Sequence, residues 1–132
     1  LKKKKLLGFL ADQDGYIHGL PVPFLGQPSS AVVGPATFAK KFGSPVVPIF
    51  TSRKPEGGHI VHILPPLHYN NSGDDDVDMY TLTEECVRVT EDFIREHPDE
   101  WIWFQHRWMT KMSEIVDYYK KLEIRERAHE KQ

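Results

Sequence analysis

The chain has 132 residues, of which 39% are hydrophobic and 27% charged, a balance typical of one modest globular domain. Its formal net charge of −2 gives no reason to expect nucleic acid as a partner. No apolar run reaches the roughly 18 residues that a transmembrane helix needs. The single cysteine, Cys86, excludes an internal disulfide bond.

The first segment of the sequence predicts a buried strand followed by a polar turn. Lysines 2–5 precede an unbroken apolar run over residues 6–11, which is typical of a strand buried on both faces. A polar turn over residues 12–14 follows it. Because a domain rarely opens on its central strand, we expect the chain to be a piece of a longer protein. In that interpretation residues 1–5 are the end of a helix.

A loop, a helix and two strands are predicted next. Residues 19–28 contain three prolines and two glycines, which favour an ordered loop. Residues 31–42 have helical apolar spacing and several small side chains, and Gly43 is placed to end that helix. Residues 45–50 and 59–64 predict two buried strands that are joined by a hairpin-type turn.

Two helices are predicted in the second half of the chain. Residues 70–78 indicate an acidic loop, and residues 81–84 match a capping box that begins a helix. That helix should end near His97, because Pro98 disfavours helical backbone before it. The order of elements predicts an α/β fold with a mixed sheet and flanking helices.

Beyond that helix the sequence carries an aromatic cluster and an amphipathic tail. The cluster spans residues 101–108 and holds three tryptophans. A further helix is predicted from Met109, and it should fray beyond Arg125 because its residues turn entirely polar. Lysines 2–5 favour contact with anionic lipid or, equally well, a solvated helix end.

Residue types alone indicate only a few candidate functional groups. His59 and His62 lie three apart in a predicted strand, so they point to opposite faces, and we expect no metal and no other cofactor. Asp12 follows a strand end, where a carboxylate can bind a hydroxyl or simply form an Asx turn. Arg107 lies among aromatic residues, an arrangement that suits a phosphate or carboxylate ligand but also occurs in cores.

Taken in order, these segments resemble the bacterial lipid A biosynthesis (lauroyl/myristoyl-type) acyltransferases. The resemblance covers residues 6–108, and the ordered set of motifs is more specific than any one of them. The residues that carry it are Ala11-Asp12-Gln13, Val22-Pro23-Phe24-Leu25-Gly26, Gly34-Pro35-Ala36, Pro45-Val46-Val47-Pro48, Leu64-Pro65-Pro66, His97-Pro98-Asp99-Glu100-Trp101-Ile102-Trp103 and Arg107-Trp108.

The resemblance implies a fold and an activity. The fold is the carboxy-terminal part of a glycerolipid-acyltransferase-like fold. A histidine, with an acid five positions later, deprotonates an acceptor hydroxyl that attacks an acyl thioester. The donor is an acyl carrier protein thioester or acyl-CoA, and the acceptor is a lipid A precursor or a related glycolipid. Such enzymes make peripheral contact with the membrane at the cytoplasmic face of the bacterial inner membrane.

This chain departs from the family pattern at two points. None of its histidines is followed five positions later by an acid, so no catalytic residue is assigned here. The family usually has a histidine where Gln105 stands. We therefore expect residues 1–108 to be the carboxy-terminal part of an acyltransferase domain and residues 109–132 to be a helical tail. The substrate-binding residues that the resemblance favours are Asp12, Gln13, Phe24, Gly26 and Arg107.

A second hypothesis comes from a different functional class. The chain is then a non-catalytic lipid-binding or scaffold module at the membrane surface. It should fold alone and bind anionic vesicles, with an affinity that falls as salt concentration rises. The acyltransferase hypothesis instead predicts a supporting part of an active site that is inactive by itself.

Overall fold

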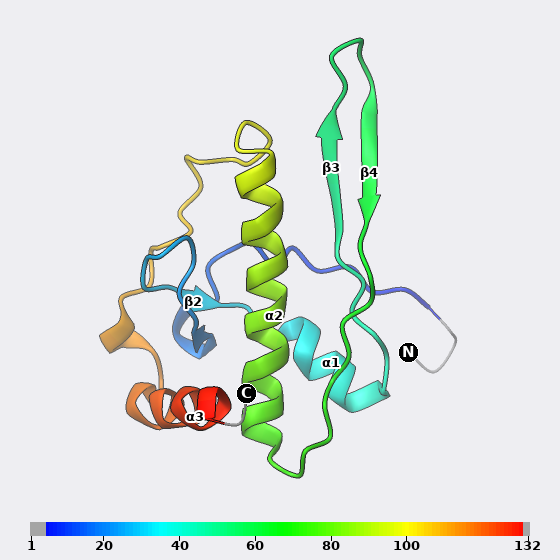
Figure 1. Cartoon of the computed structure of the whole chain (residues 1–132). Coiled ribbons are helices and arrows are strands. Elements are labelled where there is room, and N and C mark those ends of the chain that lie inside the picture. The colour runs from blue at the N-terminus through cyan, green and yellow to red at the C-terminus, as the bar shows by residue number, and fades with distance from the viewer. Residues whose placement is uncertain (1–4, 131–132) are drawn as a thin grey trace.

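The structure is a computed structural model that describes residues 5–130. A long helix, α2 (Asp75–Glu96), runs through the middle of the molecule. Two shorter helices, α1 (Gly34–Phe42) and α3 (Tyr118–Glu130), lie on opposite sides of α2 in Figure 1. A β-hairpin of β3 (Ile49–Arg53) and β4 (His59–Ile63) extends beside α2, on the same side as α1.

The described residues form a mixed α/β fold, but the prediction of a single mixed sheet is wrong. Two separate antiparallel pairs occur instead, β3 with β4 and β1 (Leu20–Pro21) with β2 (Ser30–Ala31). No parallel pair occurs among residues 5–130.

The predicted buried strand over residues 6–11 is also wrong. Residues 5–10 have no regular secondary structure and are exposed, and Leu6 is 102% exposed. An apolar run becomes a strand only when another strand pairs with its backbone, and no described segment does so. Phe9 instead packs on Phe38 of α1, with ring centroids 5.5 Å apart. The helix end expected over residues 1–5 lies outside the described residues except for Lys5, which is not helical.

Helix α1 is confirmed, although it begins at Gly34 rather than at residue 31. The first residues of the predicted helix are used by the β1–β2 pair, in which Ala31 lies opposite Leu20. Pro35 occupies the first turn, where its missing N–H costs nothing. Gly43 ends the helix in the left-handed conformation, with φ of 59°, as the sequence predicted.

Helix α2 begins earlier than the sequence predicted, and the acidic loop over residues 70–78 is partly wrong. The carboxylate of Asp74 accepts a hydrogen bond from the Val77 N–H at 3.3 Å and caps the helix. Three aspartates then occupy the first turn, where the helix dipole favours negative charge. The capping box expected at residues 81–84 therefore lies inside the helix. The predicted end before His97 is confirmed.

The β-hairpin is confirmed, but its first strand begins at Ile49 rather than at residue 45, and its strands are not buried as predicted. Ile49 lies opposite Ile63 in the ladder, and both side chains are mostly exposed. Only one face of a two-stranded pair is covered here. Phe50 and Phe93 of α2 stack on that face, with ring centroids 4.5 Å apart.

The carboxy-terminal helix differs from its prediction at both ends. A 3₁₀ turn, η2 (Met112–Glu114), replaces the expected helix start, and α3 begins only at Tyr118. The helix then continues to Glu130 rather than fraying beyond Arg125. Ala128 is 1% exposed in the main core, and that burial stabilises the last turns.

The main core lies between α2, α3 and the β1–β2 region. Its buried members are Leu20, Val22, Phe24, Ala31, Val77, Tyr80, Val87, Ile94, Ile124 and Ala128. A smaller cluster of Ala36, Ala39 and Leu82 joins α1 to α2, because small side chains let the two helices approach closely. The main core includes four residues of the segment 20–31 and so holds that segment against α2 and α3.

Candidate functional site

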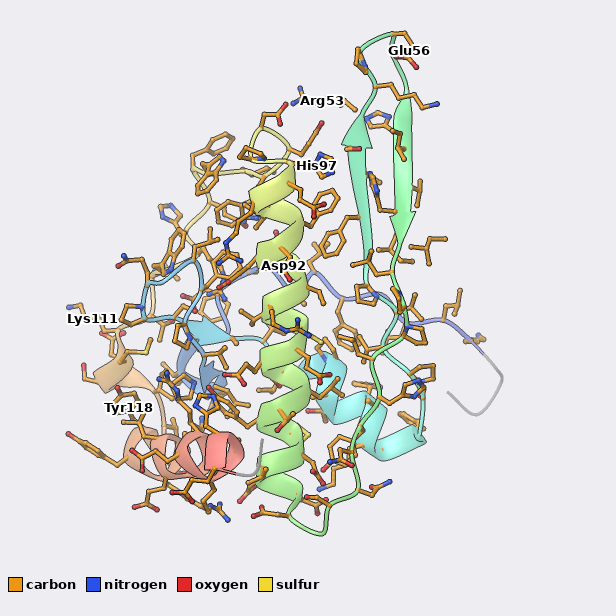
Figure 2. The ribbon with its side chains drawn as sticks, in the orientation of Figure 1. Arg53, Glu56, Asp92, His97, Lys111 and Tyr118 are labelled. Carbon is orange, nitrogen blue, oxygen red and sulfur yellow. The ribbon has the colours of Figure 1, made fainter. Side chains whose placement is uncertain are left out.

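The five residues predicted for the site lie in four places. Phe24 and Arg107 are in direct contact in the core. Asp12 binds the aromatic cluster over residues 101–108, which we call the tryptophan motif. Gln13 lines an open pocket, and Gly26 forms a tight turn. Figure 2 shows how densely side chains pack between α2 and the loops on the side of α3.

Arg107 is the largest fully buried side chain of the described residues, with 1% exposure. Its Nη1 donates a hydrogen bond to the Ser30 carbonyl at 2.9 Å. Its guanidinium carbon lies 4.5 Å from the centre of the Phe24 ring, a cation–π contact. Burial lowers the pKa of Arg107, while the charges of Asp14 and Asp12 oppose that shift. The aromatic ring that Arg107 contacts is thus Phe24, which lies outside the predicted cluster over residues 101–108, and Arg107 is not open to solvent. Its role in substrate binding stays a prediction.

Two further nitrogen atoms of Arg107, Nε and Nη2, are buried and have no hydrogen-bond partner within residues 5–130. The indole nitrogen of Trp108 is likewise buried and has no hydrogen-bond partner among the described residues. A buried cation with unsatisfied donors is costly unless nearby carboxylates offset it. The negative charges of Asp14, Asp12 and Glu91 favour the charged form of Arg107 and offset part of that cost.

Asp14 is the hydrogen-bonding centre of the site, although the sequence predicted it only as part of the polar turn over residues 12–14. Its Oδ1 accepts hydrogen bonds from the Tyr16 N–H at 2.7 Å and the Thr110 hydroxyl at 2.6 Å. Its Oδ2 accepts one from the Thr110 N–H at 3.0 Å. The side chain is 6% exposed. The only signal in the sequence was a second aspartate in the polar turn, and its partner Thr110 lies 96 residues away.

The electrostatics of Asp14 favour its charged form. Burial alone would raise its pKa, but the Thr110 and Tyr16 hydrogen bonds and the charge of Arg107 outweigh that effect. Its pKa is therefore lowered from the ordinary value of 3.8. A carboxylate held in this way orients neighbouring groups and is poorly suited to take up a proton near neutral pH.

Asp12 joins the amino-terminal turn to the tryptophan motif. Its Oδ2 accepts hydrogen bonds from the Trp101 indole at 3.2 Å and from the Gln105 amide at 3.3 Å. Gln105 is thus joined to Asp12, which lies 93 residues earlier in the chain. A half-buried carboxylate at this point has the chemistry to bind a substrate hydroxyl.

Gly26 has a conformational role. It adopts φ of 76° in the turn between Phe24 and Gln27, whose N–H and C=O groups are hydrogen-bonded to each other at 2.9 and 3.0 Å. The carboxylate of Glu91 on α2 accepts a hydrogen bond from the Leu25 N–H at 2.7 Å and fastens the turn to the helix.

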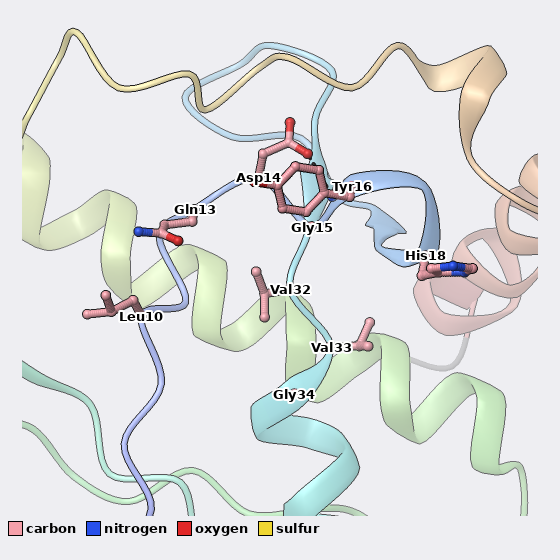
Figure 3. Close-up of a pocket in the computed structure, with 9 residues that line it drawn as sticks. All are labelled: Leu10, Gln13, Asp14, Gly15, Tyr16, His18, Val32, Val33 and Gly34. Carbon is pink, nitrogen blue, oxygen red and sulfur yellow. Dashed lines mark hydrogen bonds between the residues drawn. The ribbon is translucent and has the colours of Figure 1, made fainter.

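An open pocket of about 320 Å³ lies next to these groups, within the size range of small-molecule sites (Figure 3). It is mainly apolar, and its polar groups come from the turn that follows residue 12. The residues that line it are Leu10, Gln13, Asp14, Gly15, Tyr16, His18, Val32, Val33 and Gly34.

In the part of the chain that the structure describes, no three or more His, Cys, Asp or Glu side chains are grouped so that they could hold a metal ion. Nor is any helix there long and apolar enough to cross a membrane. His59 and His62 lie in β4 as predicted, and His62 forms a 2.8 Å hydrogen bond with Ser52.

A model of the bacterial lipid A biosynthesis acyltransferase family matches residues 1–110 of the chain. No curated protein and no solved structure gives a match. The matched range includes the polar turn, the Phe24 loop, the tryptophan motif and Thr110.

Proposed function

The chain belongs to the bacterial lipid A biosynthesis acyltransferase family, and we propose that it forms the part of the enzyme that binds the acceptor. The reaction transfers a fatty acyl group from a thioester of acyl carrier protein or coenzyme A. The receiving group is a hydroxyl of a lipid A precursor or a related glycolipid. The observation that carries this proposal is the family match over residues 1–110 of 132.

The catalytic base is proposed to come from outside this chain. No histidine in the sequence has an acid five positions later, so a deprotonating His–acid pair is missing. Asp14 does not replace it, because its pKa is lowered and its oxygens are occupied by hydrogen bonds. The chain alone is therefore inactive in this proposal, and residues 1–108 are the carboxy-terminal part of a glycerolipid-acyltransferase-like domain.

The five predicted residues take different parts in the proposed acceptor site. Gln13 contacts the acceptor, because it is exposed on the pocket. Asp12 binds a hydroxyl beside it. Arg107 and Phe24 are each 1% exposed, so in this proposal they stabilise the surrounding fold and do not touch the acceptor. Gly26 shapes the turn after Phe24.

We also propose that the protein works at the cytoplasmic face of the bacterial inner membrane. Three consecutive apolar side chains of the tryptophan motif, Ile102, Trp103 and Phe104, are 55%, 52% and 89% exposed. Aromatic side chains of this kind favour the membrane–water interface. The same observation favours the alternative function, a non-catalytic lipid-binding module.

The decisive experiment compares this chain with its parent protein. The parent should transfer the acyl group from an acyl carrier protein thioester to a lipid A precursor, and the 132-residue chain should not. Joining the chain to an upstream segment that carries a His–acid pair should restore transfer. A parent protein that moves no acyl group onto any glycolipid acceptor would rule the proposal out.

A binding assay on anionic vesicles distinguishes the alternative function, a non-catalytic lipid-binding module, from the acyltransferase. A lipid-binding module predicts vesicle binding without transfer, and the Phe104→Ser variant should weaken it because it removes the most exposed aromatic ring of the motif. Tyr119→Ser is the matched control, since Tyr119 is 79% exposed on α3, away from the motif. Transfer activity of the parent excludes a purely binding role.

A further inference from the structure

Tyr16 is an exposed aromatic residue whose backbone is held rigidly in an unfavourable conformation. It has φ of 53°, in the left-handed region that a residue with a Cβ rarely adopts. Its side chain is 61% exposed, so it adds little to the core. Residues kept in such conformations by surrounding structure occur preferentially at binding sites.

The groups that hold Tyr16 are themselves buried. Its N–H donates to Asp14 at 2.7 Å, and its carbonyl accepts from the Ser30 hydroxyl at 2.6 Å and the Gly19 N–H at 3.1 Å. Ser30 is 0% exposed and Asp14 is 6% exposed. Asp14 is bound in turn by Thr110. The Tyr16 backbone is therefore fixed by hydrogen bonds to buried groups, although its side chain is largely exposed.

The position of the glycine beside Tyr16 strengthens this argument. Glycine suits a positive φ best, yet in this turn it stands one residue earlier, at Gly15. A Cβ on Gly15 would lie 2.5 Å from the Ala31 carbonyl oxygen, so glycine is required there by close approach. The strained position carries a tyrosine instead, and its ring is one of the groups that line the pocket (Figure 3).

From this geometry we infer that Tyr16 forms a subsite in which its ring stacks on a hexose ring of the glycolipid acceptor. The inference rests on the proposed function, which supplies the class of acceptor. Tyrosine offers an apolar face and a polar tip, and a fixed backbone reduces the entropy lost on binding. Gln13 and His18 line the same pocket and supply hydrogen-bonding groups for sugar hydroxyls.

The test measures binding of octyl β-glucoside to the 132-residue chain by saturation-transfer NMR, below the micelle concentration of the glycoside. Octanoate is the probe that keeps the alkyl chain but lacks the sugar. Tyr16→Gly and Tyr16→Asn delete the ring and tolerate the positive φ, whereas Tyr16→Phe keeps the ring. Asp117→Gly is the matched control, because exposed Asp117 has φ of 55° outside the pocket.

We expect Tyr16→Gly and Tyr16→Asn to weaken glucoside binding roughly threefold to tenfold, as expected for loss of an aromatic contact. Tyr16→Phe and Asp117→Gly should bind the glucoside like the parent sequence. The urea midpoint of Tyr16→Gly should not fall, because glycine relieves the strain. A purely structural role for Tyr16 would lower the midpoint and leave binding of the glucoside unchanged.

Three results would overturn the inference: no glucoside binding by the unmodified chain, equal binding by Tyr16→Gly, or an equal loss of octanoate binding. The last result would assign the subsite to an acyl chain. The proposed function fails separately, in the transfer assay of the parent protein. Transfer without glucoside binding rejects only the subsite, and glucoside binding without transfer rejects only the enzyme.

Discussion

Replacing Asp14 with asparagine tests whether its hydrogen bonds organise the site. Asparagine keeps the shape and one acceptor oxygen, which can still serve the Tyr16 N–H and the Thr110 hydroxyl. Its Nδ2, however, must face the Thr110 N–H, so two donors meet in a buried place. The charge that favours buried Arg107 is lost as well.

The expected loss in the free energy of unfolding follows from these lost interactions. Hydrogen bonds to charged groups contribute about 1.5–3 kcal/mol each, and leaving the buried Arg107 with less opposite charge nearby adds to that cost. We therefore expect Asp14→Asn to lower the free energy of unfolding by about 3–5 kcal/mol, with a fall in Tm of roughly 10–20 °C. Urea unfolding followed by tryptophan fluorescence measures this, because Trp101 and Trp108 pack against the main core.

The pH dependence gives an independent check. A carboxyl whose pKa is lowered on folding stabilises the protein above its unfolded pKa, and that stability is lost as the pH falls through the folded pKa. The difference in stability between the unmodified chain and Asp14→Asn should therefore be constant near neutral pH and shrink below about pH 4. Asp99→Asn, on an exposed carboxyl, should change stability by less than about 0.5 kcal/mol. A cost of under about 1 kcal/mol for Asp14→Asn would refute the reasoning.

Three further outcomes are expected. Gly19→Ala should destabilise the chain by about 1–3 kcal/mol in urea unfolding, because the new Cβ would collide with the Ser30 hydroxyl. Burial, with the charge of Glu85 adding to it, raises the pKa of the Cys86 thiol to about 12, so its alkylation by iodoacetamide should be about a thousandfold slower than that of a free thiol. Asp74→Ala should cost about 1 kcal/mol and reduce helicity in circular dichroism, because it removes the α2 cap.

Each of these outcomes has a control in the same chain. Gly8→Ala should be neutral, since nothing lies within 4 Å of the place that a Cβ would take there. Cys86 should react at an ordinary rate once urea unfolds the protein. Asp76→Ala should cost less than Asp74→Ala, because Asp76 lies in the first turn and makes no cap. The structure would be contradicted if Gly19→Ala cost no more than Gly8→Ala, or if Asp74→Ala cost no more than Asp76→Ala. Fast alkylation of Cys86 in the folded chain would contradict it as well.

Local signals in the sequence predicted the elements whose causes are local. Gly43 ended α1, Pro98 limited α2, and the turn after Arg53 joined the hairpin strands, because each depends on backbone preferences of a few residues. The start of α2 was missed because Asp74 and the capping-box residues are both sound caps, and only packing of the helix decides between them.

Burial was predicted less well, since it depends on partners that are distant in the sequence. The apolar run over residues 6–11 has strand propensity, but no described strand pairs with it. The end of α3 looked too polar to be ordered, yet Ile124 and Ala128 reach the main core. Propensity describes a segment, whereas burial is a property of the whole chain.

The sequence by itself determined the family, through ordered motifs that the family match over residues 1–110 confirms. It also identified Arg107 and Asp12 as candidate substrate-binding residues. Only the tertiary structure brought Asp14 to Thr110, 96 residues away, and placed Tyr16 rigidly at the pocket. Hydrogen bonds between such distant residues leave no periodic pattern in a sequence, because they form only after the core has packed.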